Sequence, residues 1–294
     1  MIDHRHLKIA VFGANGYVAK NLRELLHFKK IDSVSSISRS DFKSYAKENK
    51  ILISNLDNSI SCNLRNYDVL IHLVGSGRQT INSDHYDINT DLTKQIIKIC
   101  KNSNIKKIIY ISGLGTAENS TICYFISKYR AERDIINSGL NYTIFRPSYI
   151  IGKQDPLSTK IINHATLHNN FCIPGSGNYL IQPIFIGDAI EIIFDSIINP
   201  LFNNGIFDLV GPEILNFREF INIFKETKKM KHRIQFTDLE YEYFNALHSS
   251  TNTYCVDDLN ILIGSFIGNC EKIQKLSGIK LKNVNYSLAA DSIF

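Results

Sequence analysis

The first half of the chain alternates short apolar runs with longer amphipathic stretches. The apolar runs predict strands at residues 8–12, 33–37, 51–53, 69–74, 107–112 and 142–145. The amphipathic stretches predict helices at residues 17–28, 91–102 and 121–138. Apart from His72, the run 69–74 is apolar throughout, which is typical of a strand covered on both faces. This alternation of strand and helix favours an α/β fold with a doubly wound parallel sheet.

The pattern changes after Pro147. Glycine and proline gather between Gly152 and Pro183, and helical patterns return at 186–198 and 217–229 with a short apolar segment at 206–210 between them. We therefore expect two regions. Residues 1–150 would form the sheet domain, and residues 151–294 a smaller region of mixed structure.

Composition narrows the class of protein. The 294 residues are 44% hydrophobic and 21% charged, as in an ordinary globular chain. Charges interrupt every long apolar run, so we expect no membrane span, and the first apolar stretch is too short for a secretory signal. Six cysteines without a C-x-x-C pair favour reduced thiols over a disulfide framework or a zinc site. These features predict a cytoplasmic protein.

Neither metal nor nucleic acid is an expected ligand. His164 and His168 share one helix face, but Ala165 stands where a zinc protease carries glutamate. The net charge of +5 is mild. The densest cluster of basic residues fits a solvated helix end at least as well as a phosphate-binding surface. It comprises Lys225, Lys228, Lys229, Lys231 and Arg233.

The strongest motif follows the first strand, where the chain reads Gly13-Ala14-Asn15-Gly16-Tyr17-Val18-Ala19. Glycines in such a turn let the backbone approach a pyrophosphate, and the following helix offers free N–H groups at its positive end. A merely structural loop is the alternative. Placed between the first strand and the first helix, the turn predicts a Rossmann-type dinucleotide site. Its expected cofactor-binding residues are Gly13, Asn15, Gly16, Tyr17 and Val18.

The end of the second strand selects between the two nicotinamide dinucleotides. An acid there binds a free ribose 2′-hydroxyl, whereas an arginine binds a 2′-phosphate. Arg39 lies at the required distance from Gly13 and favours NADP. Asp41, two residues later, keeps NAD open, and Arg39 could also be an ordinary exposed residue.

Ser112, Tyr124 and Lys128 are the candidate catalytic residues. Tyr124 and Lys128 are four residues apart on a predicted helix, so they share one face. A phenol with a pKa near 10 is a poor base at neutral pH, and we expect the Lys128 ammonium, helped by the oxidised nicotinamide, to lower that pKa. Ser112 would orient the substrate oxygen. A second pair, Tyr149 and Lys153, has Gly152 between its members, which argues against a helix, and a surface role for Tyr124 and Lys128 stays open.

Taken together, these motifs resemble the extended or atypical short-chain dehydrogenases/reductases, labelled NAD-dependent epimerases/dehydratases. The nearest resemblance is to the branch that contains the accessory nucleotide-binding subunit of respiratory complex I. The resemblance covers most of the chain. Besides the glycine turn and the Ser, Tyr and Lys set, it rests on residues 71–75, 111–115, 145–148, 182–184 and 209–213, and on Asn89, Glu132 and Asp188.

The resemblance implies further contacts. Gly75 would lie near the cofactor ribose, and Asn89 would support the catalytic helix. Asn55 stands where many relatives carry an aspartate that contacts the adenine. The cofactor-binding residues implied in this way are Asn55, Leu56, Val74, Gly75, Lys128 and Pro147.

Two functions fit these expectations. The first is an NADP(H)-dependent oxidoreductase or epimerase/dehydratase that acts on a hydroxyl or carbonyl group, with a sugar nucleotide among the candidate substrates. The second is a non-catalytic NADP(H)-binding protein with a structural, assembly or redox-sensing task. The expected partners are a small-molecule substrate and either a second copy of the chain or a larger complex.

Overall fold

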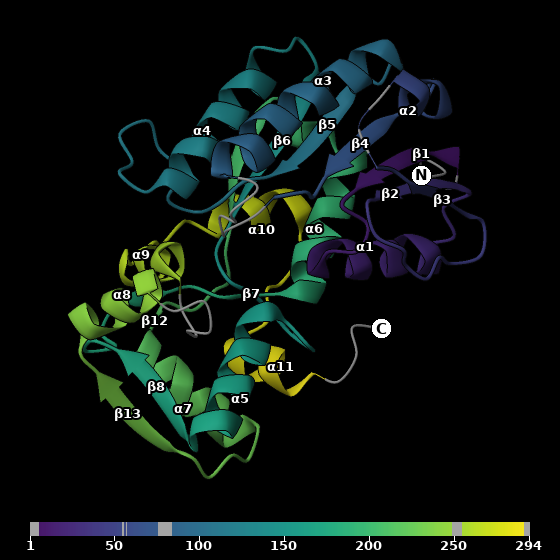
Figure 1. Ribbon diagram of the computed structural model, residues 1–294. Coiled ribbons are helices and arrows are strands. Elements are labelled where there is room, and N and C mark those ends of the chain that lie inside the picture. The colour runs from purple at the N-terminus through teal and green to yellow at the C-terminus, as the bar shows by residue number, and fades with distance from the viewer. Residues whose placement is uncertain (1–5, 55, 57, 76–83, 249–254, 291–294) are drawn as a thin grey trace.

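A seven-stranded, fully parallel sheet forms the centre of the computed structural model (Figure 1). The structure describes residues 6–54, 56, 58–75, 84–248 and 255–290. The strand order is β11-β6-β5-β4-β1-β2-β3. Because the order reverses between β1 and β4, a ligand crevice is expected at their carboxyl ends. The strands are β1 (Lys8–Phe12), β2 (Ser33–Ser38), β3 (Glu48–Leu52), β4 (Val69–His72), β5 (Lys107–Ile111), β6 (Asn141–Pro147) and β11 (Gly205–Leu209).

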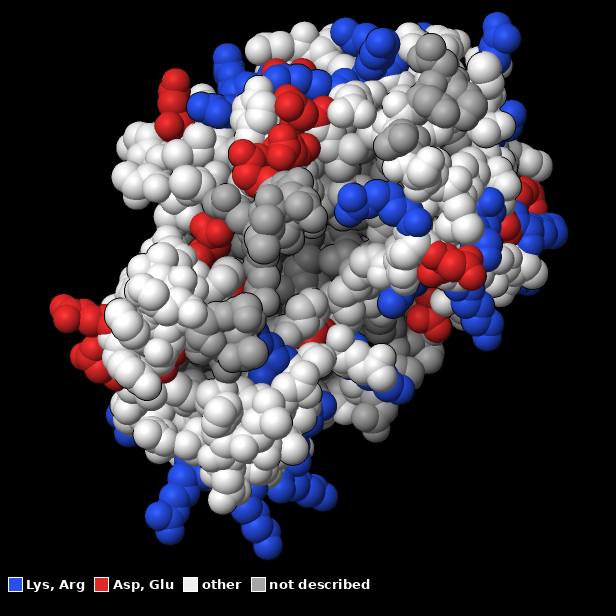
Figure 2. Space-filling view, viewed as in Figure 1, with Lys and Arg blue, Asp and Glu red and all other residues white. Residues whose placement is uncertain are grey.

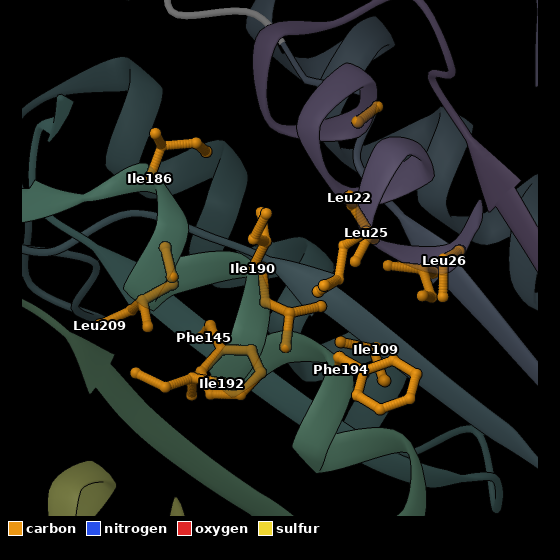
Figure 3. Close-up of a cluster of buried hydrophobic side chains, with 14 of the residues drawn as sticks. Leu22, Leu25, Leu26, Ile109, Phe145, Ile186, Ile190, Ile192, Phe194 and Leu209 are labelled. Atoms are coloured by element: carbon orange, nitrogen blue, oxygen red, sulfur yellow. The ribbon is translucent and has the colours of Figure 1, made fainter. Parts of the chain in front are cut away.

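Helices cover both faces of the sheet, which confirms the doubly wound α/β fold (Figure 1). On one face, α2 (Asn58–Asn63), α3 (Leu92–Asn102) and α4 (Cys123–Ile136) bury one apolar core. On the other face, α1 (Tyr17–Phe28) and α6 (Ile186–Ile198) bury a second core. Figure 3 shows Leu22 and Leu25 of α1 directed towards Ile190 of α6.

A smaller region lies below the sheet in Figure 1 and has its own core, built around Phe217, Phe220 and Phe224. Short strand pairs and helices surround that core. The described α-helices and β-strands after β6, apart from α6 and β11, are β7 (Ile150–Ile151), α5 (Pro156–His168), β8 (Asn170–Pro174), β9 (Leu180–Ile181), β10 (Ile184–Phe185), β12 (Leu215–Asn216), α7 (Phe217–Thr227), β13 (Arg233–Thr237), α8 (Leu239–His248), α9 (Val256–Ile263), α10 (Glu271–Ser277) and α11 (Val284–Ala289).

The sheet domain continues beyond residue 150, where the sequence placed the boundary between the regions. Strand β11 pairs with β6, and α6 packs against α1. Ile273 and Leu281 also belong to the core between these helices and the sheet. The sequence pattern identified the segments 186–198 and 206–210 but carried no information about their pairing. A cut at residue 150 would remove the last strand from the sheet.

The basic cluster lies at the far end of the smaller region. Figure 2 shows lysine and arginine side chains projecting there, over the turn between α7 and β13. One of them, Lys228, donates a hydrogen bond to the carbonyl oxygen of Leu288, 2.6 Å away. Among the described residues, no helix combines the length and the apolar character that crossing a bilayer requires.

Candidate cofactor and active site

The glycine turn, residues 13–16, places no side chain over the N-terminus of α1. Gly13 has φ +87°, and a Cβ atom there would lie 3.0 Å from the backbone of Leu73 and Val74, so only glycine fits. Gly16 is the N-cap of α1 and provides no side-chain cap. A Cβ atom at Gly16 would lie 3.3 Å from the carbonyl oxygen of Gly13. No side chain of the turn covers the N-terminus of α1. Its free N–H groups and the positive end of its dipole can therefore contact a pyrophosphate.

A cleft of about 470 Å³ opens beside this turn, at the carboxyl ends of β1, β2 and β4. This is the place expected for a dinucleotide in such a sheet. Seven of the proposed cofactor residues line it: Gly13, Asn15, Gly16, Arg39, Leu56, Val74 and Gly75. The residue types and the volume fit a dinucleotide whose pyrophosphate lies on the turn.

Three other proposed cofactor residues are placed differently or not described. The side chains of Tyr17 and Val18 pack against the core between α1, α6 and the sheet. The Tyr17 hydroxyl is directed towards Gly152, where a Cβ atom would lie 3.0 Å from it, and burial raises the Tyr17 pKa. These two residues can therefore offer the cofactor their backbone N–H groups. Asn55 lies outside the described residues.

A buried ion pair holds the glycine turn in place through a hydrogen bond to its backbone. Arg23 of α1 pairs with Glu48 of β3 at 2.5 Å, and both side chains are at most 4% exposed. The remaining guanidinium donors reach the carbonyl oxygens of Ala14, at 3.0 Å, and Lys43, at 2.8 Å. Arg23 thus ties the glycine turn to the loop before β3. No periodic pattern or motif in the sequence predicted this contact, because Arg23 and Glu48 are distant along the chain.

Arg39 and Asp41 lie near the expected position of the ribose 2′-oxygen. Arg39 is exposed and lines the cleft. Asp41, the alternative ribose-binding residue, pairs with Lys50 at 2.6 Å, and this hydrogen bond lowers the Asp41 pKa. Asn15 donates to the Ser40 hydroxyl at 3.0 Å, which fixes the turn beside Arg39. The Arg39 side chain therefore lines the cleft, while the Asp41 carboxylate already has a partner.

Ser112 and Tyr124 line a second cavity, of about 180 Å³. Gly113 separates β5 from the Tyr124 ring, and a Cβ atom at Gly113 would lie 3.3 Å from the phenol oxygen. Pro147, which the resemblance assigned to the cofactor, lines this cavity and not the cleft. Tyr149 also lines it, although the sequence singled Tyr149 out only as part of a rejected pair.

Lys128 lies between the cleft and this cavity. Its ammonium nitrogen donates to the carbonyl oxygen of Ile111 at 3.0 Å and lies 5.9 Å from the centre of the Tyr124 ring. A Cβ atom at Gly75, which lines the cleft, would lie only 2.8 Å from that nitrogen. Burial lowers the Lys128 pKa to about 7, although the negative charge of Glu132 acts to raise that pKa. Lys128 can therefore donate to a group bound beside Gly75.

The electrostatics of Tyr124 differ from the sequence prediction. We expected Lys128, together with the oxidised nicotinamide, to lower the Tyr124 pKa, whereas in the protein by itself burial raises that pKa to about 12. The physical reason is that the cost of removing the phenolate from water exceeds its attraction to the Lys128 ammonium, which lies 5.9 Å from the ring centre. Burial also disfavours the charge of Lys128 itself. Without a further positive charge in the cleft, Tyr124 is a neutral proton donor.

A buried hydrogen-bond network holds the helix that carries Tyr124. The Asn89 amide donates to the Ser127 hydroxyl at 3.0 Å, and Ser127 donates to the Tyr124 carbonyl oxygen at 2.7 Å. Asn89 lies in a π-helical turn, Tyr86–Asp91. His72 lies 3.0 Å from the Thr93 hydroxyl, and burial lowers its pKa to about 3. The neutral His72 therefore belongs to the core.

The smaller region supplies a wall of the second cavity that sequence reasoning missed. Phe266 packs on Phe125 with ring centres 4.8 Å apart, and it covers Gly115 so closely that a Cβ atom would meet it at 2.5 Å. His85 contacts Asp257 of α9 at 2.8 Å, and its ring packs edge-on against Tyr124. Residues 85 and 257 are far apart in sequence and belong to no motif, so no signal could have joined them.

Comparison with known proteins decides the family. A model described as NAD(P)H-binding matches residues 13–171, which span the glycine turn, Tyr124 and Lys128. The chain belongs to the NAD(P)H-binding family. The family match covers more than half of the chain and supports a nicotinamide cofactor without selecting NADP.

Relatives of this NAD(P)H-binding chain include a respiratory-complex subunit. Subunit 9 of the NADH dehydrogenase [ubiquinone] 1 alpha subcomplex from Dictyostelium discoideum, a mitochondrial protein, is 26% identical over 229 residues. That match covers 74% of this chain and 63% of the relative, so the chain spans less than two thirds of the relative's length. The likeness bears out the resemblance seen in the sequence, while the cytoplasmic location stays a prediction.

Solved structures share the fold of this NAD(P)H-binding chain. A nucleoside-diphosphate-sugar epimerase from Staphylococcus aureus has a TM-score of 0.78 at 16% identity, with 97% of this chain and 100% of that chain covered. The UDP-glucuronic acid 4-epimerase from Bacillus cereus in complex with NAD has a TM-score of 0.76 at 16% identity, with 97% of each chain covered. At this identity the likeness concerns the fold alone.

Proposed function

We propose that this protein is an NADP(H)-dependent oxidoreductase or epimerase/dehydratase of the short-chain dehydrogenase/reductase type, acting on a hydroxyl or carbonyl group. One observation carries the proposal. Lys128 lies between a cleft suited to a dinucleotide and a cavity lined by Ser112 and Tyr124. Cofactor and substrate can therefore meet beside one acid/base group.

Each residue has a distinct role in this proposal. The bound dinucleotide supplies hydride chemistry at its nicotinamide ring. Ser112 donates to the substrate oxygen and orients it towards Tyr124. Tyr124, neutral because burial raises its pKa to about 12, gives its proton to that oxygen during reduction. Lys128 binds the ribose beside Gly75, and the network from Asn89 keeps the helix that carries Tyr124 in place.

We assign NADP as the preferred cofactor. The exposed Arg39 guanidinium in the cleft can bind a 2′-phosphate, and pairing with Lys50 leaves Asp41 less available to a ribose hydroxyl. The epimerase of like fold from Bacillus cereus contains NAD, which is a property of that protein. NAD is therefore the competitor in the binding test.

The second candidate is a non-catalytic NADP(H)-binding role within a larger assembly. The observation that favours it is the likeness to a named subunit of a respiratory complex. The cavity beside Tyr124 favours the enzyme, because a protein that only stores the cofactor has no need of an empty space next to a Ser, Tyr and Lys set.

The test is the variant Tyr124→Phe, with Tyr129→Phe on the same helix as the matched control. We expect Tyr124→Phe to keep NADPH affinity and to lose turnover by roughly 10²- to 10⁴-fold, as for loss of a general acid. Turnover is followed as NADPH consumption over a panel of ketones, aldehydes and nucleotide sugars. Full activity of Tyr124→Phe on a substrate of the parent protein would overturn the assignment.

A further inference from the structure

The cavity beside Tyr124 is apolar apart from hydroxyl groups. Its described lining includes no lysine, arginine, histidine, aspartate or glutamate. The apolar wall consists of Leu114, Phe125, Pro147, Leu180, Ile181, Ile261 and Phe266. A dry apolar cavity of about 150 Å³ is known to hold one benzene molecule. At about 180 Å³, this cavity has room for an apolar group of similar size next to the phenol of Tyr124.

A groove adjoins this cavity, and the charges among its described lining residues are balanced. A groove of about 610 Å³ shares Tyr149 and Ile261 with the cavity. Among its described lining residues, Lys160 is the only cation, and it pairs with Asp258 at 2.7 Å. The other polar side chains of the described lining are neutral and belong to Tyr149, Gln154, Thr159 and Asn163.

This lining is poorly suited to a nucleoside diphosphate. A diphosphate is bound by unpaired cations, by backbone N–H groups at a helix N-terminus, or by both. The first turn of α5 lines the groove, but its N-terminus is already capped: the Ser158 N–H donates to the Asp155 carboxylate at 2.8 Å, and Pro156 has no N–H. In the groove, a diphosphate near Lys160 would also lie beside the carboxylate of Asp258, which opposes its negative charge. A ligand with neutral polar groups, by contrast, can bind in the groove without disturbing the Lys160–Asp258 pair.

We infer that the substrate is an uncharged carbonyl compound, or the matching alcohol, with an apolar group about the size of one ring in the cavity beside Tyr124. The inference rests on the proposed function and narrows its substrate class. In the reductive direction the carbonyl carbon gains the hydride of the reduced nicotinamide, its π bond to oxygen breaks, and the oxygen takes the Tyr124 phenol proton. The nicotinamide is oxidised, and solvent returns a proton to the phenol.

The test compares two probes on the protein saturated with NADP⁺, which cannot reduce them. Acetophenone provides one ring and a carbonyl, and UDP-glucose provides a sugar on a diphosphate. We expect saturation-transfer NMR to show acetophenone binding and no UDP-glucose binding. The parallel assay follows reduction of acetophenone by NADPH, and it should detect 1-phenylethanol as the product.

Matched variants link any binding to the cavity. Ile261→Asn places an amide in the apolar wall and should weaken acetophenone binding about tenfold or more. Ile267→Asn makes the same change at a 48% exposed position outside the lining and should leave binding unchanged. Leu180→Asn, at a lining position that is 36% exposed, repeats the test where folding is less at risk.

The outcomes separate this inference from the proposed function. If NADPH binds but acetophenone does not, or if UDP-glucose binds and acetophenone does not, the substrate class is wrong while the cofactor assignment stands. Acetophenone binding that Ile261→Asn and Leu180→Asn leave unchanged also overturns the inference. If neither NADPH nor NADH binds, the proposed function itself fails.

Discussion

The ammonium nitrogen of Lys128 lies 3.0 Å from the carbonyl oxygen of Ile111, the last residue of β5. This hydrogen bond fixes the lysine at the carboxyl edge of the sheet, between the cleft and the Tyr124 cavity. Glu132, one turn further along α4, could neutralise the ammonium, but it forms two hydrogen bonds with Arg146, at 2.9 and 2.6 Å. Lys128 is therefore a buried amine whose charge has little local compensation, and its pKa falls to about 7.

The first prediction concerns stability and pH. Because the folded pKa of Lys128 is about 7 and the unfolded value about 10.4, the unfolded chain binds more protons here between these values. The lysine thus destabilises the fold most at and below pH 7, and the penalty disappears as pH rises towards 10. Lys128→Met should raise the free energy of unfolding at pH 7 by on the order of 1–4 kcal/mol.

Urea unfolding between pH 6 and 9.5 measures this difference. The gain of Lys128→Met over the parent protein should shrink steadily above pH 7, while exposed Lys101→Met should show no such trend. The same Lys128→Met variant should bind NADPH more weakly. A gain that is constant with pH, or a loss of stability at every pH, would show that Lys128 is not a buried amine of lowered pKa.

The second prediction concerns the ion pair below the glycine turn. Arg23→Met leaves the Glu48 carboxylate buried and unpaired, and should lower the free energy of unfolding by about 3–5 kcal/mol. The double variant Arg23→Met/Glu48→Leu removes both charges and should recover part of that loss. Chemical denaturation of the three proteins decides the matter. A single variant as stable as its parent would mean that the pair does not support the turn.

The third prediction separates cofactor contact from folding at Gly16. Its φ of −70° is accessible to any residue, but a Cβ atom would lie 3.3 Å from the Gly13 carbonyl oxygen and valine is a poor N-cap, so Gly16→Val should lower the free energy of unfolding by about 1 kcal/mol. The added side chain should nevertheless obstruct the pyrophosphate and weaken NADPH binding at least about tenfold. Gly139→Ala is the reverse control. Its φ of +79° predicts a loss of about 1–2 kcal/mol without any change in binding.

Local sequence patterns predicted the elements that build the cofactor cleft. Residues 8–12 and 17–28 form β1 and α1 with the predicted bounds, because the apolar run, the glycine turn and the amphipathic helix follow one another directly. The turn itself needs a φ of +87° at Gly13, a requirement that its glycine signals in the sequence. Such features depend on residues that are neighbours in the chain, and so they can be read before folding is known.

Contacts between distant residues could not be predicted. Arg23 meets Glu48, and His85 meets Asp257, through folding that no local pattern encodes. The raised pKa of Tyr124 in the protein by itself was not predicted, for a related reason. The spacing of Tyr124 and Lys128 predicted a cation near the phenol. The burial that raises the Tyr124 pKa depends on the packing of Phe125 and Phe266, which the spacing does not reveal.

The most direct measurement is a calorimetric titration of the protein with NADPH and with NADH, in parallel with Arg39→Ala and the exposed control Arg65→Ala. We predict that the parent and Arg65→Ala bind one NADPH per chain more tightly than NADH. Arg39→Ala should lose that preference while keeping its affinity for NADH, because only the 2′-phosphate contact is removed. If neither NADPH nor NADH binds, the assignment of the cleft as a dinucleotide site is wrong.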